Sequence, residues 1–268
     1  LCAEDPSKGF MPSIGKIDSI DFYSDEGSRL ETGVRSGDEV SPFYDSMIAK
    51  LIAKGADRSQ ALDRLIRDLR NTHPTGIRTN AAFLVNLLSL PKVRSADMDT
   101  GLIAREIEAL SDQRISRALL ERAIGDLLKN RRHAERLRPN YHKTQIAPTD
   151  PWNDADAFRL GPQDTHQVHV LIEGEPRRLK YRWATRDKPK LVDAGGLAVL
   201  DTAAPDDAHV SWRHTDRVAA FERGRRAEIS WPTYDATALD EGAAGDTIRA
   251  PINGKVAKIF VAEGETVE

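Results

Sequence analysis

Apolar residues recur at intervals of three and four positions through the middle of the chain, which is the period of an amphipathic helix. The pattern predicts helices from Asp57 to about Leu69, from Thr79 to a stop before Pro91, from Gly101 to Leu110, and from Ser111 or Asp112 through Leu128. Asp57 can cap the first of these helices, with Gln60 completing a box-like pair. Because each helix has one apolar face, we expect them to pack on a common core.

Shorter alternating segments lie on both sides of the helical region. Turns and short strands are predicted over residues 1–45, with period-two alternation at Lys16–Phe22 and further strands at Gly33–Val34 and Asp38–Val40. A hairpin is predicted from residues 165–173 and 177–184, and an antiparallel meander from residues 197–202, 209–213, 218–222 and 227–231. Several short strands at this spacing favour a sandwich or a barrel.

The last part of the chain has a different texture. Residues 233–247 are rich in Ala, Gly and Asp, as in a linker, and residues 250–268 alternate, turn at Gly264 and resume at Thr266. The first residues resemble neither an initiation site nor a leader. We therefore expect the chain to be an interior part of a longer polypeptide, and we expect the final hairpin to be poorly covered.

Composition narrows the classes of protein. A chain of 268 residues with 40% hydrophobic and 30% charged side chains is long enough for one large domain or two to three ordinary ones. Its net charge of −3 gives no overall attraction to nucleic acid, and no apolar run approaches the ~20 residues of a membrane span. The single cysteine, Cys2, excludes an intramolecular disulfide and a Cys-rich metal site.

Few residues suggest chemistry by themselves. His166 and His169 are three apart on a predicted strand and point to opposite faces, so a metal site is disfavoured. The basic run at residues 129–138 fits a solvated helix end, with a partner-binding patch as the alternative. Tyr44 and Asp45 fit either a functional pair at a cleft, or a tyrosine anchor beside an N-cap.

Several ordered motifs resemble a known family. The segments "CAEDPSKGFMPSIGKI" (2–17), "GVRSGDEVSPFYDSMIAKLIAKGADRSQALDRL" (33–65), "GIRTNAAFL" (76–84) and "DTGLI" (99–103) resemble the C-terminal domain of biotin carboxylase. The segment "VAAFERGRRAEISWP" (218–232) resembles the linking barrel of acyl-CoA carboxylase α subunits, with Ala219 and Ala220 where bulkier residues are common. The end, residues 248–268, is similar to the first half of a biotin carboxyl carrier domain, with Ile252 in place of the usual Met.

The resemblance implies an α+β fold in four parts: a biotin carboxylase C-terminal domain at 1–110, a helix with an antiparallel β-barrel at 111–232, a linker at 233–247, and an incomplete biotinyl β-sandwich at 248–268. It implies the α subunit of a biotin-dependent acyl-CoA carboxylase, a ligase most like those acting on 3-methylcrotonyl-CoA in leucine degradation. Biotin, ATP with Mg²⁺ or Mn²⁺, bicarbonate, and a carboxyltransferase β subunit that binds the acyl-CoA are the implied cofactors and partners, in a hetero-oligomer without nucleic acid or a membrane span. A bacterial cytoplasm, or a mitochondrial matrix, is the implied compartment.

The resemblance assigns few residues. It places Tyr44 and Asp45 at the wall of the biotin cleft, Leu102 against adenine, and Arg29 or Arg35 at a subunit interface. The metal-binding and catalytic residues would precede Leu1, with the arginine that grips bicarbonate and biotin directly before it, and the biotinylation motif would follow Glu268. We therefore expect these 268 residues alone to be inactive.

Other assignments stay open. The piece could serve as a non-catalytic assembly and docking module, or belong to a propionyl-, acetyl- or geranyl-CoA carboxylase. A pyruvate carboxylase is disfavoured, because about 140 residues between Leu110 and Arg249 are too few for the ~250 of a TIM-barrel carboxyltransferase.

Overall fold

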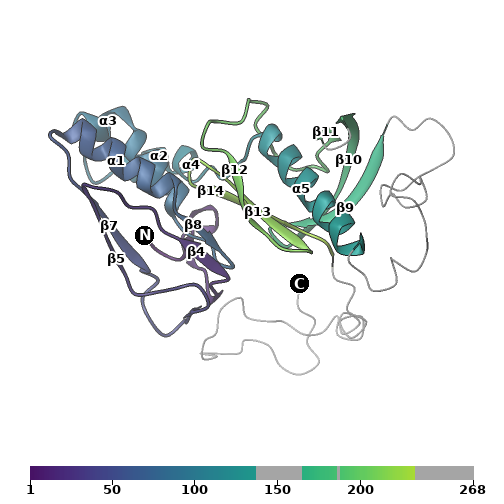
Figure 1. The fold of residues 1–268 in the computed structure, drawn as a ribbon. Coiled ribbons are helices and arrows are strands. Elements are labelled where there is room, and N and C mark those ends of the chain that lie inside the picture. The colour runs from purple at the N-terminus through teal and green to yellow at the C-terminus, as the bar shows by residue number, and fades with distance from the viewer. Residues whose placement is uncertain (137–164, 186–187, 233–268) are drawn as a thin grey trace, which may run out of the picture.

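A computed structural model describes residues 1–136, 165–185 and 188–232, with the side chains of residues 132–136 and 211–213 left aside. The described chain forms two units that lie next to each other (Figure 1). The first unit, residues 1–110, combines short strands with helices α1 to α4. The second unit consists of helix α5 and the sheet β9–β14. None of the described helices is long and apolar enough to cross a membrane.

The strands of the first unit pair two by two. They are β1 (Glu4–Asp5), β2 (Met11–Pro12), β3 (Gly15–Lys16), β4 (Ser19–Asp21), β5 (Ser28–Thr32), β6 (Glu39–Val40), β7 (Ala49–Ala53) and β8 (His73–Thr75). The antiparallel pairs are β1–β2, β3–β6, β4–β8 and β5–β7. A cluster that includes Ile17, Val40, Ile48 and Ile77 is buried between these small sheets.

The predicted strand at Lys16–Phe22 is broken in two. Ile17 N–H donates to Asp38 O beside the β3–β6 pair, whereas Asp18 N–H donates to Thr75 O beside β4–β8. The backbone therefore changes partner in mid-segment, which alternation along the sequence cannot show. The predicted strand at Gly33–Val34 is wrong, because the strand at this place is β5, which ends at Thr32.

Three of the four helices described in the first unit agree with their prediction, and the short helix α3 was not predicted. The four helices are α1 (Arg58–Arg70), α2 (Ala81–Ser89), α3 (Pro91–Arg94) and α4 (Leu102–Leu110). The Asp57 side chain caps α1 by accepting from Gln60 N–H at 2.8 Å. Gln60 Oε1 in turn accepts from Ala56 N–H at 2.7 Å, so the return bond falls one residue before the expected position. Pro91 ends α2, as predicted, and begins α3.

Helix α5 (Arg117–Arg136) begins later than predicted. Asp112 does not cap a helix, because its carboxylate accepts from the backbone and the guanidinium of Arg114 and closes a local turn. Ser116 is the capping residue, since its hydroxyl accepts from Leu119 N–H at 3.2 Å. The segment between α4 and α5 is thus a structured connection rather than a helical turn.

The second unit is one six-stranded antiparallel sheet. Its strands are β9 (His166–Ile172), β10 (Glu175–Thr185), β11 (Lys188–Asp193), β12 (His209–Arg213), β13 (Arg217–Glu222) and β14 (Arg225–Ser230). Their order is β11-β10-β9-β14-β13-β12, so two meanders are joined by the β9–β14 pair. The predicted hairpin is confirmed. Residues 197–202 are not a strand, since only Leu200 forms a bridge, with Ser116, and β11 had no counterpart in the prediction.

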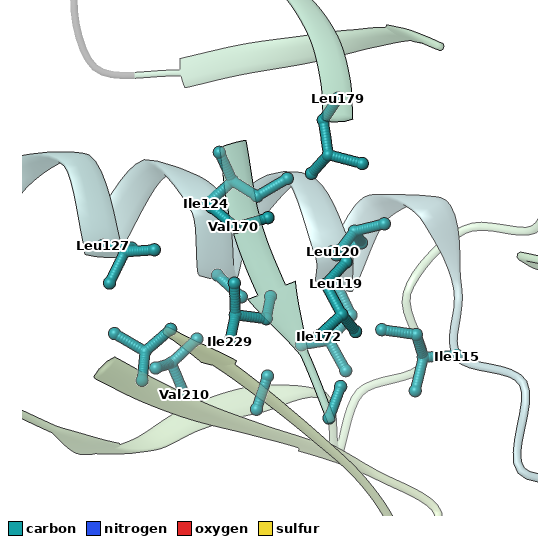
Figure 2. Packing of buried hydrophobic residues seen from close by; sticks show 14 of the residues in the cluster. Ile115, Leu119, Leu120, Ile124, Leu127, Val170, Ile172, Leu179, Val210 and Ile229 are labelled. Carbon is teal, nitrogen blue, oxygen red and sulfur yellow. The ribbon is translucent and has the colours of Figure 1, made fainter. Parts of the chain in front are cut away.

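Helix α5 lies against this sheet, and its buried apolar face forms part of the shared core. Leu119, Leu120, Ile124 and Leu127 are all 0% exposed. Figure 2 shows these side chains directed at Val170, Ile172 and Ile229 of the strands. Burial of each Leu or Ile side chain contributes about 1.5–3 kcal/mol to stability. The contact between α5 and the sheet is therefore a major source of stability for the second unit. The described strands form a curled sheet with β11 and β12 at its edges, and the closed barrel stays a prediction.

Some predictions concern other parts of the chain. Trp183 and Trp231 are partly buried at the core of the second unit, as expected, while Trp152 and the side chain of Trp212 lie outside the described residues. In the basic run, the Arg131 guanidinium lies 4.9 Å from the centre of the Trp231 ring. The linker at 233–247 and the partial biotinyl unit at 248–268 also lie outside the described residues.

Candidate functional site

The N-terminal segment of the first unit is held between two other segments. The Leu1 ammonium donates to Ala49 O at 2.8 Å, and Ile48 N–H donates to Leu1 O at 3.0 Å. On the other side, Cys2 N–H donates to Asn80 Oδ1 at 3.0 Å, and Asn80 N–H donates back to Cys2 O at 3.1 Å. Residues 1–3 are therefore a fixed strap between the β7 segment and the start of α2.

The residues that precede β7 form an exposed apolar patch beside this strap. Phe43 and Tyr44 are each 85% exposed, and Met47 is 47% exposed. Met47 forms a β-bridge with Cys2, so the patch is anchored to the strap. Two neighbouring aromatic rings at such exposure are uncommon on a surface that faces only water. The patch has the character of a surface for recognition.

Asp45 lies in this patch but its carboxylate is used locally. Its Oδ1 accepts from Met47 N–H at 3.2 Å, which stabilises the turn before β7. Ser46 lies next to it, and its hydroxyl donates to Glu4 Oε1 at 2.5 Å. The N-cap expected as one alternative for Asp45 is therefore wrong, because its carboxylate holds a turn before a strand and not the start of a helix.

The other candidate residues lie apart from this patch along the chain. Arg29 lies on β5, opposite Ile52 of β7, and forms an exposed ion pair with Glu31 at 3.2 Å. Arg35 is exposed in a turn in which its N–H donates to Asp38 Oδ2 at 2.9 Å. Leu102 begins α4 and is only 3% exposed, so its side chain packs inside the first unit.

Burial is the main cause of a lowered pKa at two groups of the first unit. Burial lowers the pKa of the Leu1 ammonium below its ordinary value. Burial, and secondarily the nearby His209 ring, lower the pKa of His73 to about 4. His73 lies where the two units meet, far along the chain from the strap. Burial is the largest cause of both shifts, so the perturbations reflect packing.

The described residues offer little for bond-breaking chemistry. No group of three or more His, Cys, Asp or Glu among them could hold a metal ion. His166 stacks on Tyr181 with ring centres 5.3 Å apart, and His169 is exposed on the other face of β9. The histidines thus diverge as the strand period predicts. The first unit presents an exposed apolar patch beside the strap.

Sequence reasoning did not single out the residues that join the two units. Arg78 and Glu173 form an ion pair at 2.6 Å although they are 95 positions apart. Arg226 reaches the same glutamate at 3.1 Å. Arg78 lies in the "GIRTNAAFL" motif, but a surface arginine in a motif gives no signal for its partner. Only the three-dimensional structure assigns these residues.

Comparisons with known proteins concern the first unit most directly. Residues 1–105 match the family described as the biotin carboxylase C-terminal domain. The methylcrotonoyl-CoA carboxylase subunit alpha of Dictyostelium discoideum is 26% identical over 300 residues, which covers 100% of this chain and 41% of that protein. The corresponding subunit of Mus musculus is 28% identical over 290 residues, covering 100% of this chain and 40% of that protein.

A third relative matches a shorter region. The propionyl-CoA carboxylase alpha chain of Caenorhabditis briggsae is 38% identical over 100 residues, which is 37% of this chain and 14% of that protein. The chain thus spans about two fifths of the length of the two methylcrotonoyl-CoA carboxylase subunits. Residues 1–105 thus match the biotin carboxylase C-terminal domain, and the chain as a whole is similar to the alpha subunits of methylcrotonoyl-CoA carboxylase.

Proposed function

We propose that this chain is part of the α subunit of a biotin-dependent acyl-CoA carboxylase that acts on 3-methylcrotonyl-CoA. The observation that carries the proposal is the extent of the similarity. Both methylcrotonoyl-CoA carboxylase subunits align with all of this chain, whereas the propionyl-CoA carboxylase chain aligns with 37% of it. The second unit, with α5 in its curled sheet, therefore has a counterpart in the former alignments.

The proposal divides the chain into four parts. Residues 1–110 are the C-terminal domain of the carboxylase, and residues 111–232 are a linking domain that binds a carboxyltransferase β subunit. Residues 233–247 link this domain to the first half of a biotin carrier at 248–268. The cellular compartment is the bacterial cytoplasm or, in a eukaryote, the mitochondrial matrix.

The proposal gives the exposed patch a role in biotin chemistry. Tyr44 would lie at the wall of the cleft that receives biotin, since its ring is exposed and it lies three residues before the Met47 bridge to the strap. Asp45 would shape this wall through its turn. Leu102, which is buried, would contact adenine only through the small part of its surface that is exposed at the start of α4. Arg29 or Arg35, both exposed, would lie at a subunit interface.

Phosphoryl transfer from ATP needs cations and metal ligands arranged around the phosphates. The described residues offer no metal-ligand group, and we derive no step of this reaction from them. This chain would contribute the cleft wall and the connection between the carboxylase and its partner subunit.

The test is an assay of biotin- and bicarbonate-dependent ATP cleavage. We expect ATP cleavage by a longer polypeptide that joins the 268 residues to a nucleotide-binding carboxylase domain. Avidin, which binds biotin, should inhibit this cleavage. We expect no cleavage by residues 1–268 alone. Turnover by the 268 residues alone, or biotin-independent cleavage by the longer polypeptide, would refute the proposal.

A second function, that of a docking module, is favoured by the second unit. Its core is built from α5 and the sheet, and its described residues contain no group of metal ligands. Binding of residues 1–268 to a carboxyltransferase β subunit in sedimentation velocity experiments would support this role. Absence of binding at micromolar concentrations would count against it.

A further inference from the structure

The two units meet through a node of charged side chains centred on Glu173. Its Oε2 accepts from Arg78 Nη2 of the first unit at 2.6 Å and from Arg226 Nη2 of the second unit at 3.1 Å. Its Oε1 accepts from Glu228 N–H at 2.7 Å. This carboxylate thus accepts from three donors on two segments, the residues before α2 and strand β14. It lies in the β9–β10 turn at a backbone φ of 52°.

Each arginine of the node also contacts a further residue of the first unit. Arg78 Nε lies 3.4 Å from Oδ2 of Asp5, which is 5% exposed in β1. Arg226 Nη1 donates to Ile77 O at 2.7 Å. The node therefore joins β1, the start of α2, the β9–β10 turn and β14 into one continuous set of hydrogen bonds and ion pairs. A planar guanidinium suits this task because its donors point in fixed directions.

The two units also contact each other at a second place, through aromatic rings. The His73 ring lies 4.3 Å from the His209 ring and 4.7 Å from the Phe221 ring, measured between centres. Phe221 is 1% exposed. At Gly224, whose φ is +74°, an added Cβ would lie 3.2 Å from Ala82 N, so the turn between β13 and β14 touches the backbone of α2.

The covalent connection between the units is held as well. The Arg225 guanidinium donates to Asp112 O at 3.1 Å and to Arg114 O at 2.9 Å. Ser116 N–H and Oγ–H donate to the two carboxylate oxygens of Glu222 at 2.6 and 2.7 Å. The segment between α4 and α5 is thus bound to the sheet at both ends and does not have the character of a hinge.

We propose that this contact is a lock that makes the two units one rigid body, with Glu173 as its central residue. Domains in one chain usually move relative to each other unless their interface is extensive or well fixed. Here an ion-pair node, an aromatic cluster and a bound connection act at separate places. Any partner held by the second unit keeps a fixed position relative to the first unit. The inference depends only on described residues and not on the proposed substrate.

The test measures the distance between the units in the complete 268-residue chain. Spin labels are attached to cysteines placed at Ser59, in α1, and at Lys180, in β10, in a background in which Cys2 is replaced by Ala; both chosen positions are exposed. Pulsed electron double resonance then gives the distribution of distances between the labels. We expect one narrow peak for the unaltered lock.

Glu173→Gln keeps the shape of the side chain but removes its charge and turns an amide N–H₂ or a weaker acceptor toward two arginines. We expect the peak to broaden at least twofold or to split. Glu175→Gln is the matched control, because it makes the same chemical change two residues away at an exposed side chain, and the peak should stay narrow. Arg78→Lys keeps the charge but cannot reach Asp5 and Glu173 together, and should broaden the peak to a smaller extent.

Spectra of each label alone report whether each unit is still folded in every variant. If Glu173→Gln fails to fold, Arg78→Lys decides the outcome. A broad distribution in the unaltered chain would overturn the lock. A peak that stays narrow in the folded variants of both Glu173 and Arg78 would overturn the role of the node.

Discussion

Removing the hydroxyl of Ser116 should destabilise the second unit more than its size suggests. The hydroxyl donates to Glu222 Oε2 at 2.7 Å and accepts from Leu119 N–H at 3.2 Å. Ser116 and Glu222 are 1% and 2% exposed, so water cannot replace either bond in Ser116→Ala without entering the core. The side chain therefore links the start of α5 to β13.

The magnitude follows from the two bonds. A hydrogen bond to a charged group contributes about 1.5–3 kcal/mol. An N-cap contributes about 1 kcal/mol. Because one hydroxyl makes both, and Ser116 N–H still donates to Glu222, the two values do not add fully. We expect Ser116→Ala to lower the free energy of unfolding by about 2–3 kcal/mol.

Urea unfolding followed by tryptophan fluorescence is the appropriate assay. All four tryptophans, at positions 152, 183, 212 and 231, lie after α4, so their fluorescence reports on the second part of the chain. Ser59→Ala, at an exposed serine in α1, is the control and should change the free energy by less than about 0.5 kcal/mol. A loss below about 0.5 kcal/mol for Ser116→Ala would refute the reasoning.

Three further predictions concern stability. The native pKa of His73, about 4, lies below its ordinary value of 6.5, so the unfolded chain binds the extra proton between these values. The stabilisation by neutral His73 is therefore complete above pH 6.5 and is lost as the pH falls toward 4. Urea titrations should show a loss of about 1–2 kcal/mol, after allowance for partial exposure of the ring. His73→Gln should lack this pH-dependent loss, whereas the control His169→Gln should retain it. Gly224→Ala should lower the free energy of unfolding by about 1–2 kcal/mol for its positive φ, and by an additional amount for the contact with α2. Gly174→Ala, at a similar φ of +81° with open space around it, should show only the backbone part. Equal losses of stability in the two variants would contradict the close approach of Gly224 to α2. Leu120→Ala, at a 0% exposed position, should lower the free energy of unfolding by about 2–5 kcal/mol. The control Val192→Ala, at 51% exposure, should lower it by less than about 1 kcal/mol. A loss below about 1 kcal/mol for Leu120→Ala would contradict the place of α5 in the core.

Local signals explain what the sequence predicted well. The caps and the apolar spacing of α1, and the proline after α2, act within one turn of each helix, so they can be recognised without tertiary structure. The β9–β10 hairpin follows from alternation around Gly174, whose φ is +81°. Such features predicted most helices and five of the six strands of the second unit.

Features that depend on distant partners could not be predicted. The segment Lys16–Phe22 is divided because its backbone bonds move from Asp38 to Thr75. The start of α5 is set by Glu222, which lies 106 positions from Ser116. The node of Arg78 and Glu173 likewise joins residues far apart in the chain. No periodic pattern carries this information, because it arises from contacts between segments that are far apart in the chain.

The candidate site was predicted in part. Tyr44 and Asp45 were selected as an unusual pair after a proline, and the structure places Tyr44 on an exposed patch and Asp45 in a local turn. Their roles beside biotin, like the roles of Leu102, Arg29 and Arg35, stay predictions. A test of these roles needs the ligands and the partner subunit themselves, namely biotin, adenine and a second chain.

The most direct test of the proposed function is the choice of acyl-CoA. The measurement is fixation of labelled bicarbonate by the α polypeptide that contains these 268 residues, together with its carboxyltransferase β subunit, biotin attached and ATP present. Substrates are 3-methylcrotonyl-, propionyl-, acetyl- and geranyl-CoA at equal concentrations. We predict that kcat/KM is at least tenfold higher for 3-methylcrotonyl-CoA than for the other three. Fixation with none of the four, or a preference for another acyl-CoA, would contradict the proposal.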